Sequence, residues 1–136
     1  MAIITWTEEL SIDIPEIDDE HKHLIALINR LHDAMSQGRG KQNLLDIFTE
    51  LFEYAKTHFT HEERLMAQAN YRGLASHKRE HDFFTRKVVE LHKRFVAGEL
   101  AITIEVLNFL KDWVVHHVRG MDKAYSPALR QSMGLG

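Results

Sequence analysis

The sequence predicts an all-α protein, an up-down-up-down antiparallel four-helix bundle with an extended N-terminal arm. Apolar residues recur at steps of three and four over four long segments, which is the spacing of one buried helix face. Alternation with period two is never sustained, so a β-sheet is not expected. Glycines separate the segments, at Gly38, Gly40, Gly73 and Gly98. Short connections of this kind favour neighbouring helices that run in opposite directions.

The predicted elements leave no room for a second domain, so residues 1–136 are expected to form a single one. The arm is expected at residues 1–17, whose apolar side chains can pack on the bundle. Asp18 or Asp19 is the expected N-cap of the first helix. The four helices are predicted at about residues 19–36, 41–70, 74–97 and 102–125. Residues 126–136 are expected to be a polar, partly disordered tail.

Composition excludes several classes of function. Lys and Arg total 17 and Asp and Glu total 20, so the formal charge is −3, and without a basic block nucleic-acid binding is not expected. The absence of cysteine excludes disulfides, thiolate zinc sites and iron–sulfur clusters. Neither a signal peptide nor an apolar run of transmembrane length is visible, which predicts a cytoplasmic protein without membrane insertion. A monomer is expected, because the bundle and the arm account for the apolar residues.

Each predicted helix carries an apolar stripe that polar residues interrupt. In chain order, the stripes pass through Leu24, Ile28 and Leu31; Leu44, Phe48 and Leu51; Phe84, Val88 and Leu91; and Val106, Leu110 and Trp113. The polar residues at stripe positions are His21, His58, Glu62, His77, His81 and His117. An unpaired buried carboxylate costs several kcal/mol or is forced into its neutral form. A metal centre that binds all of these side chains would compensate for their burial.

The spacing of these residues is compatible with metal ligation. His58 and Glu62 are four residues apart, and so are His77 and His81, so each pair shares one helix face. Asp122 follows His117 by five residues, which places the two about 140° apart on an ideal helix. They converge only if the helix is locally widened or the carboxylate reaches sideways. Gly120, between them, can permit that distortion.

The histidines also allow interpretations that involve no metal. A single pair four residues apart arises easily by chance, and a lone His21 on an apolar face is more often an ordinary core residue. Four helices that each supply ligand types to the same core are a joint event, which favours a metal. Stripe continuity selects His58 over His61, and the step from Trp113 selects His117 over His116. The histidines left off the site are His23, His32, His61, His92 and His116.

The number of ligands restricts the metal. Imidazole-rich sites suit zinc, copper, iron and nickel. Seven ligands are too many for one tetrahedral zinc. Two carboxylates can bridge two ions. If three of the five histidines bind one ion and two bind the other, the first ion is saturated and the second keeps an open position. The carboxylate-rich ferritin-like pattern, with its paired Glu-x-x-His motifs, is absent.

In these residues and their order, the sequence resembles the hemerythrin family, specifically its single-domain bacterial members. The matching segments are Ile17–His21, His58–Glu62, His77–His81 and Trp113–Asp122. The resemblance implies two iron ions per chain with a bridging oxo or hydroxo group. It implies that the saturated iron is bound by His77, His81 and His117, the open iron by His21 and His58, and that Glu62 and Asp122 bridge. Dioxygen would bind at the open iron.

The expected oxygen pocket consists of apolar residues one helical step from the ligands: Leu24, Phe59, Trp113, Val114 and Val118. A dry pocket admits dioxygen and disfavours water and anions. The predicted function is therefore reversible dioxygen binding for transport, storage or delivery to an oxygen-consuming enzyme, and not catalysis. The alternative is a di-iron protein that senses or detoxifies oxygen or nitric oxide. An enzyme would need a substrate channel and an electron source, and neither is visible in the sequence.

Overall fold

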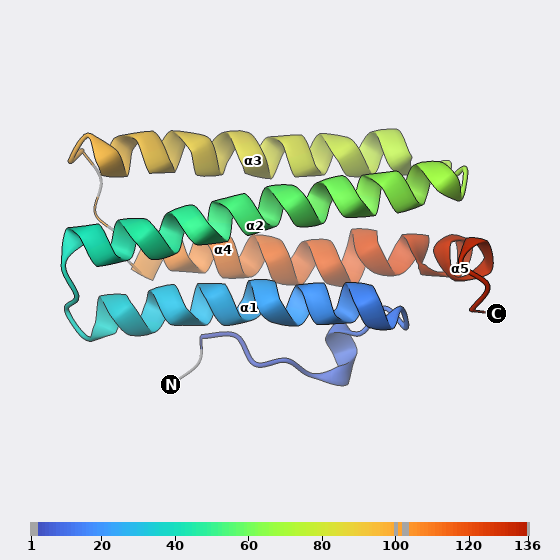
Figure 1. Cartoon of the computed structure of the whole chain (residues 1–136), viewed down its shortest axis with the longest axis horizontal. Helices are drawn as coiled ribbons and strands as arrows, with labels where there is room; N and C mark the ends of the chain where they lie inside the picture. The colour runs from blue at the N-terminus through green and yellow to red at the C-terminus, as the bar shows by residue number, and fades with distance from the viewer. Residues whose placement is uncertain (1–2, 100, 102–103, 136) are drawn as a thin grey trace.

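The predicted bundle is confirmed by the computed structural model, which describes residues 3–99, 101 and 104–135. Four long helices run alternately up and down (Figure 1): α1 Pro15–Ser36, α2 Lys41–Gln68, α3 Leu74–Val96 and α4 Ile104–His117. Within the described part of the chain there is no β-strand. The expected first residue of the fourth helix, Ile102, lies outside the described residues.

The N-terminal arm is shorter than predicted, and the first helix begins earlier. α1 starts at Pro15 rather than near Asp19, and a short 3-10 helix, η1 Glu8–Leu10, interrupts the arm. Proline suits the first position of a helix because its φ is preset and its missing N–H would have no partner there. Asp18 does not cap the helix. Its carboxylate accepts hydrogen bonds from Ser11 and from the backbone N–H of Ile12, which fastens the arm to α1.

Residues with positive φ terminate three of the helices. Gly38 follows α1 with φ of 68° and Gly98 follows α3 with φ of 77°. After α2 the same role falls to Asn70, with φ of 52°. Each is followed by a backbone N–H that bonds to a carbonyl five residues earlier, which closes the helix end. These turns reverse the chain within a few residues and produce the antiparallel order.

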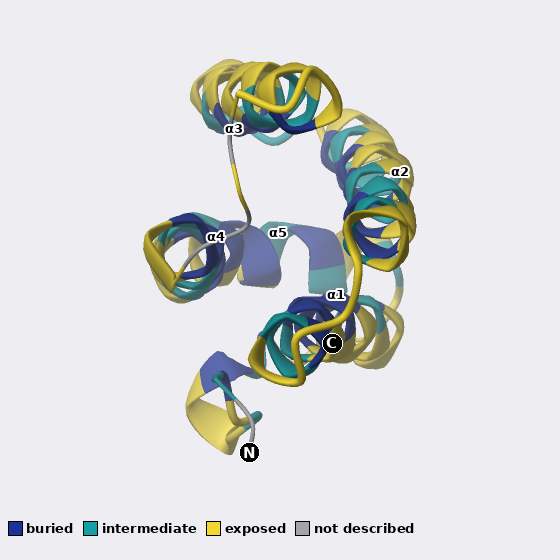
Figure 2. Cartoon of the chain, turned by 90° about the vertical axis from the view of Figure 1, so that its left-hand side faces the viewer, coloured by how far each residue is buried: buried dark blue, intermediate teal, exposed yellow. Residues whose placement is uncertain are grey.

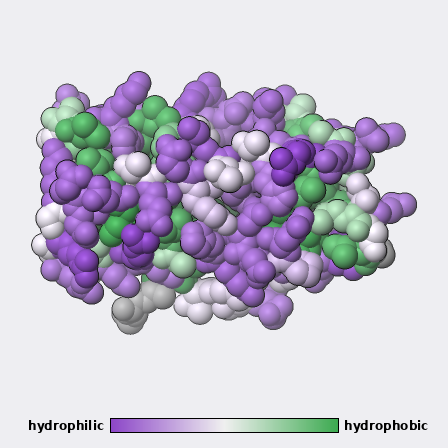
Figure 3. All heavy atoms as spheres, in the orientation of Figure 1, coloured by the Kyte–Doolittle hydropathy of each residue, from purple (hydrophilic) through white to green (hydrophobic). Residues whose placement is uncertain are grey.

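The core is built from the predicted stripes. Ile28, Leu31, Phe48 and Leu110 are each fully enclosed. Figure 2 shows the buried residues facing the bundle interior, and the face seen in Figure 3 is largely hydrophilic with scattered hydrophobic areas. None of the described helices combines the length and the apolar content required to cross a membrane.

The C-terminal segment was predicted incorrectly as a disordered tail. A five-residue π-helix, η2 Val118–Asp122, continues α4 and leads into a further helix, α5 Lys123–Ser132, which lies across the far end of the bundle (Figure 2). Tyr125 and Leu129 are four residues apart and have no exposed surface. On the same helix, Ser126 donates a hydrogen bond to the Ile12 carbonyl of the arm. The polar appearance of this segment was misleading, because its few apolar residues are buried against the bundle and Pro127 lies within α5.

Loss of this end cap should be costly. We expect Leu129→Ala to lower the free energy of unfolding by about 2–5 kcal/mol, because it leaves a cavity where a fully enclosed side chain packed. Leu135→Ala, at a side chain that is 39% exposed, is the control and should change stability little. Urea denaturation of both variants tests this. Equal stability of the two would show that α5 does not pack in solution.

Candidate metal centre

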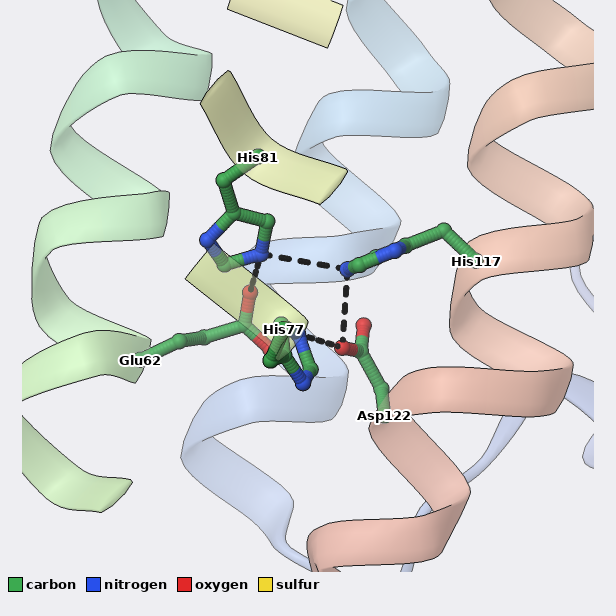
Figure 4. A group of neighbouring side chains, drawn as sticks. All are labelled: Glu62, His77, His81, His117 and Asp122. Atoms are coloured by element: carbon green, nitrogen blue, oxygen red, sulfur yellow. Dashed lines mark hydrogen bonds and ion pairs between the residues drawn. The ribbon is translucent and has the colours of Figure 1, made fainter. Parts of the chain in front are cut away.

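The seven predicted ligand residues are all buried and converge at one level of the bundle. They are His21, His58, Glu62, His77, His81, His117 and Asp122. Figure 4 shows five of them, from α2, α3, α4 and η2, pointing toward one another. Their ligand atoms form two overlapping groups. In each group, all atoms lie within 4.8 Å of one another. The larger group holds the histidines of α3 and α4 with both carboxylates, and the smaller holds the histidines of α1 and α2 with Glu62.

The π-helix brings His117 and Asp122 together. A π-helix has wider turns than an α-helix, so residues five apart move onto one face. The His117 Nε2 and Asp122 Oδ1 atoms are 3.2 Å apart. Of the two possibilities that the five-residue spacing left open, the structure thus shows the local widening of the helix. Gly120 lies within this π-helix.

The two carboxylates lie between the two groups of histidines. Asp122 turns Oδ1 toward His77 Nε2 at 2.8 Å and turns Oδ2 toward His21 Nε2 at 3.1 Å. Glu62 Oε1 is 3.0 Å from His58 Nε2 and 3.5 Å from His81 Nε2. Each carboxylate thus approaches histidines of both groups, and Asp122 does so with a different oxygen on each side.

Three glutamates outside the centre orient the histidines. Each accepts a hydrogen bond from a histidine Nδ1 and leaves Nε2 directed inward. The pairs are Glu20 with His58 at 2.6 Å, Glu63 with His81 at 2.8 Å and Glu80 with His117 at 3.1 Å. Sequence reasoning missed these residues. The signal in the sequence is that each of these glutamates directly neighbours a predicted ligand in the chain. In the structure, however, each bonds to a ligand on the following helix.

Tyr125 of α5 is a further residue that the sequence prediction missed. Its hydroxyl donates a hydrogen bond to Glu62 Oε2 at 2.5 Å, and its ring stacks on His77 with centroids 5.4 Å apart. Burial and the neighbouring negative charges of Glu62 and Asp122 raise its pKa well above the ordinary value. The hydroxyl therefore stays neutral and remains a donor. It was overlooked because the segment after Tyr125 was expected to be disordered.

Electrostatics in the centre favour charged histidines and charged carboxylates. Burial opposes a charge on His21, but the closely approaching carboxylates of Asp122 and Glu62 outweigh it and raise the pKa to about 9. Burial likewise opposes a charge on His58, yet Glu62 and Glu20 raise its pKa to about 10. Burial would raise the pKa of Glu62, but the His58 charge and further hydrogen bonds hold it well below the ordinary value. These side chains compensate for one another's burial electrostatically.

Hydrogen bonding within the centre nevertheless stays incomplete. Among the described residues, both ring nitrogens of His21 and His77, both oxygens of Asp122 and one oxygen of Glu62 have no hydrogen-bond partner. Buried polar atoms in that condition cost free energy unless something binds them. Imidazole nitrogens and carboxylate oxygens are suitable ligands for iron and for other transition metals. The residues present therefore fit a metal centre.

The residues expected to form the oxygen pocket are buried or half-buried, and two of them contact proposed ligands. Leu24, Phe59, Val114 and Val118 are buried, and Trp113 is half-buried. Phe59 stacks on the His81 ring at 3.9 Å between centroids, and Trp113 stacks on the His117 ring at 4.4 Å. The two aromatic residues thus contact the three-histidine group. Phe59 also approaches His58, at 5.9 Å.

His61 and His116, the two nearby histidines that were rejected as ligands, lie outside the centre. His61 is partly exposed, and its Nδ1 contacts the outer oxygen of Glu20 at 2.7 Å. His116 is exposed. By contrast, His58 and His117 are 2% and 4% exposed. Helix periodicity separates the members of each pair.

Comparison with known proteins identifies similar chains. The profile of the family described as "Hemerythrin HHE cation binding domain" matches residues 13–129. The chain is 38% identical over 133 residues to "Bacteriohemerythrin" of Pseudomonas aeruginosa, covering 98% of this chain and 86% of that protein. It is 37% identical over 134 residues to "Bacteriohemerythrin" of Methylococcus capsulatus, covering 95% and 98%. A crystal structure of wild-type hemerythrin superposes with a TM-score of 0.91 at 34% identity, covering 94% and 98%.

The raised histidine pKa values predict a pH dependence of the metal-free protein. A histidine whose pKa in the folded protein exceeds its ordinary value of 6.5 stabilises the fold fully when the pH is below 6.5. This stabilisation is lost as the pH rises through the folded-state pKa. We therefore expect the free energy of unfolding to fall by at least about 1 kcal/mol between about pH 6.5 and pH 9.5. Urea titrations of chelator-treated protein measure it. His92→Asn, far from the centre, should keep this slope, and a flat profile in the wild type would contradict the electrostatic description.

Proposed function

The chain belongs to the hemerythrin family, and from that premise we propose that it binds dioxygen reversibly at two iron ions and carries, stores or delivers it. The observation that supports this most directly is the position of Asp122. Its two oxygens face histidines of opposite groups at 2.8 and 3.1 Å, as a bridge between two ions requires. Seven ligand side chains, five of them histidines, exceed the needs of a single ion.

The ligands divide unequally between the two ions. We assign His77, His81 and His117 to one iron and His21 and His58 to the other, with Glu62 and Asp122 bridging. When bound, two ferrous ions would each supply one electron to dioxygen and would take it back on release. With one histidine fewer, the side held by His21 and His58 would leave a position at which a ligand could enter.

The protein around the iron pair keeps the reaction reversible. Phe59 and Trp113 cover the rings of His81 and His117, and Leu24 lies one helical turn from His21. Apolar cover excludes the water and anions that promote irreversible oxidation. Glu20, Glu63 and Glu80 hold the histidine rings in the orientation that ligation needs.

Binding rather than catalysis is supported by the shortage of free polar groups. Among the described residues, the buried polar side chains are the seven proposed ligands and Ser126. The Ser126 hydroxyl bonds to the Ile12 carbonyl, and the Tyr125 hydroxyl is held by Glu62. In the part of the chain that the structure describes, no further buried side chain is available as a proton donor or nucleophile for cleaving a bound molecule. We propose a cytoplasmic monomer whose recipient is an oxygen-consuming enzyme.

Iron content and colour test the proposal. Protein loaded with ferrous iron under nitrogen should hold about two irons per chain, and a visible band should appear with oxygen and disappear on purging over repeated cycles. His116 and His117 are neighbours in the chain and provide a matched pair of variants. His117→Asn should lose stoichiometric iron, whereas His116→Asn should retain it. Stoichiometric iron in both variants would contradict the proposed ligand set. Oxygen or nitric oxide that is consumed without being released would contradict a reversible carrier.

Oxidation rates test the apolar cover. Leu24→Ala and Trp113→Ala should each speed the loss of the oxygenated form by about tenfold or more, because water gains access to the iron pair. Leu51→Ala is the control, since Leu51 is as buried as Leu24 but lies two turns before His58. Decay of the visible band gives the rates. Unchanged rates in both of the first two variants would remove these residues from the oxygen pocket.

A further inference from the structure

A surface hollow between α3 and α4 borders Trp113, which packs against the proposed ligand His117. Its volume is about 570 Å³, and its lining consists of Ser76, Arg79, Glu80, Phe83, Trp113 and Met121. Figure 2 shows α3 and α4 standing apart on this side of the bundle. Phe83 is 46% exposed here, although it is a large apolar side chain. Aromatic residues are enriched in the cores of protein–protein interfaces, so Phe83 is suited to contact a protein partner.

One aromatic ring connects this hollow to a proposed iron ligand. Trp113 lines the hollow and stacks on His117, with ring centroids 4.4 Å apart and planes inclined by 12°. The Nε2 atom of His117 is directed inward, 3.2 Å from Asp122. Two stacked rings therefore span the distance from the protein surface to the centre. Electron transfer between a surface partner and the iron pair would have a short, closely packed route here.

A second hollow, with a volume of about 540 Å³, is lined by the proposed ligand His58 itself. The Glu20 carboxylate there accepts hydrogen bonds from His58 and His61, and among the described residues no aromatic ring of the lining stacks on His58. The carboxylates of Glu20 and Glu53 are matched in this lining by Lys56 and Arg64. This hollow therefore lacks both a stacked route and a surplus of basic side chains.

The charge distribution favours an acidic partner at α3. This helix carries six basic and three acidic side chains, whereas α1 carries two basic and five acidic ones. The basic residues of α3 are all exposed: Lys78, Arg79, Arg86, Lys87, Lys93 and Arg94. None of them forms one of the ion pairs found among the described residues. In a protein of net charge −3, a basic helix of this kind attracts and orients an acidic protein.

We propose that the α3–α4 face around Trp113 and Phe83 docks an acidic one-electron carrier protein that re-reduces the iron pair after oxidation. The inference rests on the proposed function, because loss of an electron pair from the iron centre creates the need for reduction. Two successive encounters deliver two electrons, one to each ferric ion, and each carrier molecule is oxidised by one electron. The bridging oxygen takes up one proton from solvent. No bond to the carrier forms or breaks.

Docking can be tested without iron. The probe is an acidic flavodoxin, added at low ionic strength to metal-free, isotopically labelled protein. Amide chemical shifts should change at α3 and at the α4 residues around Trp113, and should revert at about 0.3 M salt, because exposed charges are screened. Shifts centred on α1 and α2, or no shifts at all, would overturn the proposed surface. Since no iron is present, this result is independent of oxygen binding.

Reduction kinetics test the route. Arg86→Glu with Lys87→Glu should slow reduction of the oxidised iron protein by reduced flavodoxin by about tenfold or more, as steering charges act on association. Lys56→Glu with Arg64→Glu makes the same charge change on α2 and should have little effect. Both variants should bind two irons and oxygen normally. Equal slowing in both would overturn docking at α3, and a Trp113→Leu variant reduced at the wild-type rate would overturn the aromatic route.

Discussion

Seven ionisable side chains inside one small bundle are the constraint on which the structure depends. Each would be costly to bury alone. The bundle compensates by directing the side chains toward one another at distances of about 3 Å and by holding the histidines from outside with glutamates. This arrangement requires all four long helices at the same level. The packing of the core therefore serves the centre as well as stability.

The outer glutamates connect the helices in sequence. Glu20 of α1 holds a histidine of α2, Glu63 of α2 holds one of α3, and Glu80 of α3 holds one of α4. Each glutamate is adjacent in the chain to a proposed ligand, so one short segment both supplies a ligand and orients the ligand of its neighbour. A shift of one helix along its axis would disturb two rings at once. The register of the helices is thus tied to the geometry of the centre.

Much of this could be predicted from the sequence, because local periodicity carries it. Helical spacing identified the four helices, and the spacing of His117 and Asp122 suggested the local widening that η2 supplies as one of two possibilities. Features that depend on distant partners could not be predicted. The start of α1 at Pro15 depends on how the arm packs, and α5 depends on the surfaces that bury Leu129. The pairing of Glu80 with His117 likewise depends on which face of α3 meets α4.

The position of the π-helix and α5 has a consequence for biosynthesis. His21 is made about a hundred residues before Asp122, and a ribosome releases domains from the N-terminus onward. Until η2 has emerged, a nascent chain offers histidines without the carboxylate that faces both groups. Tyr125 and the contact between Ser126 and Ile12 follow later still. The full set of seven ligand side chains is therefore complete only after η2 has been synthesised, and its fastening by α5 comes later still.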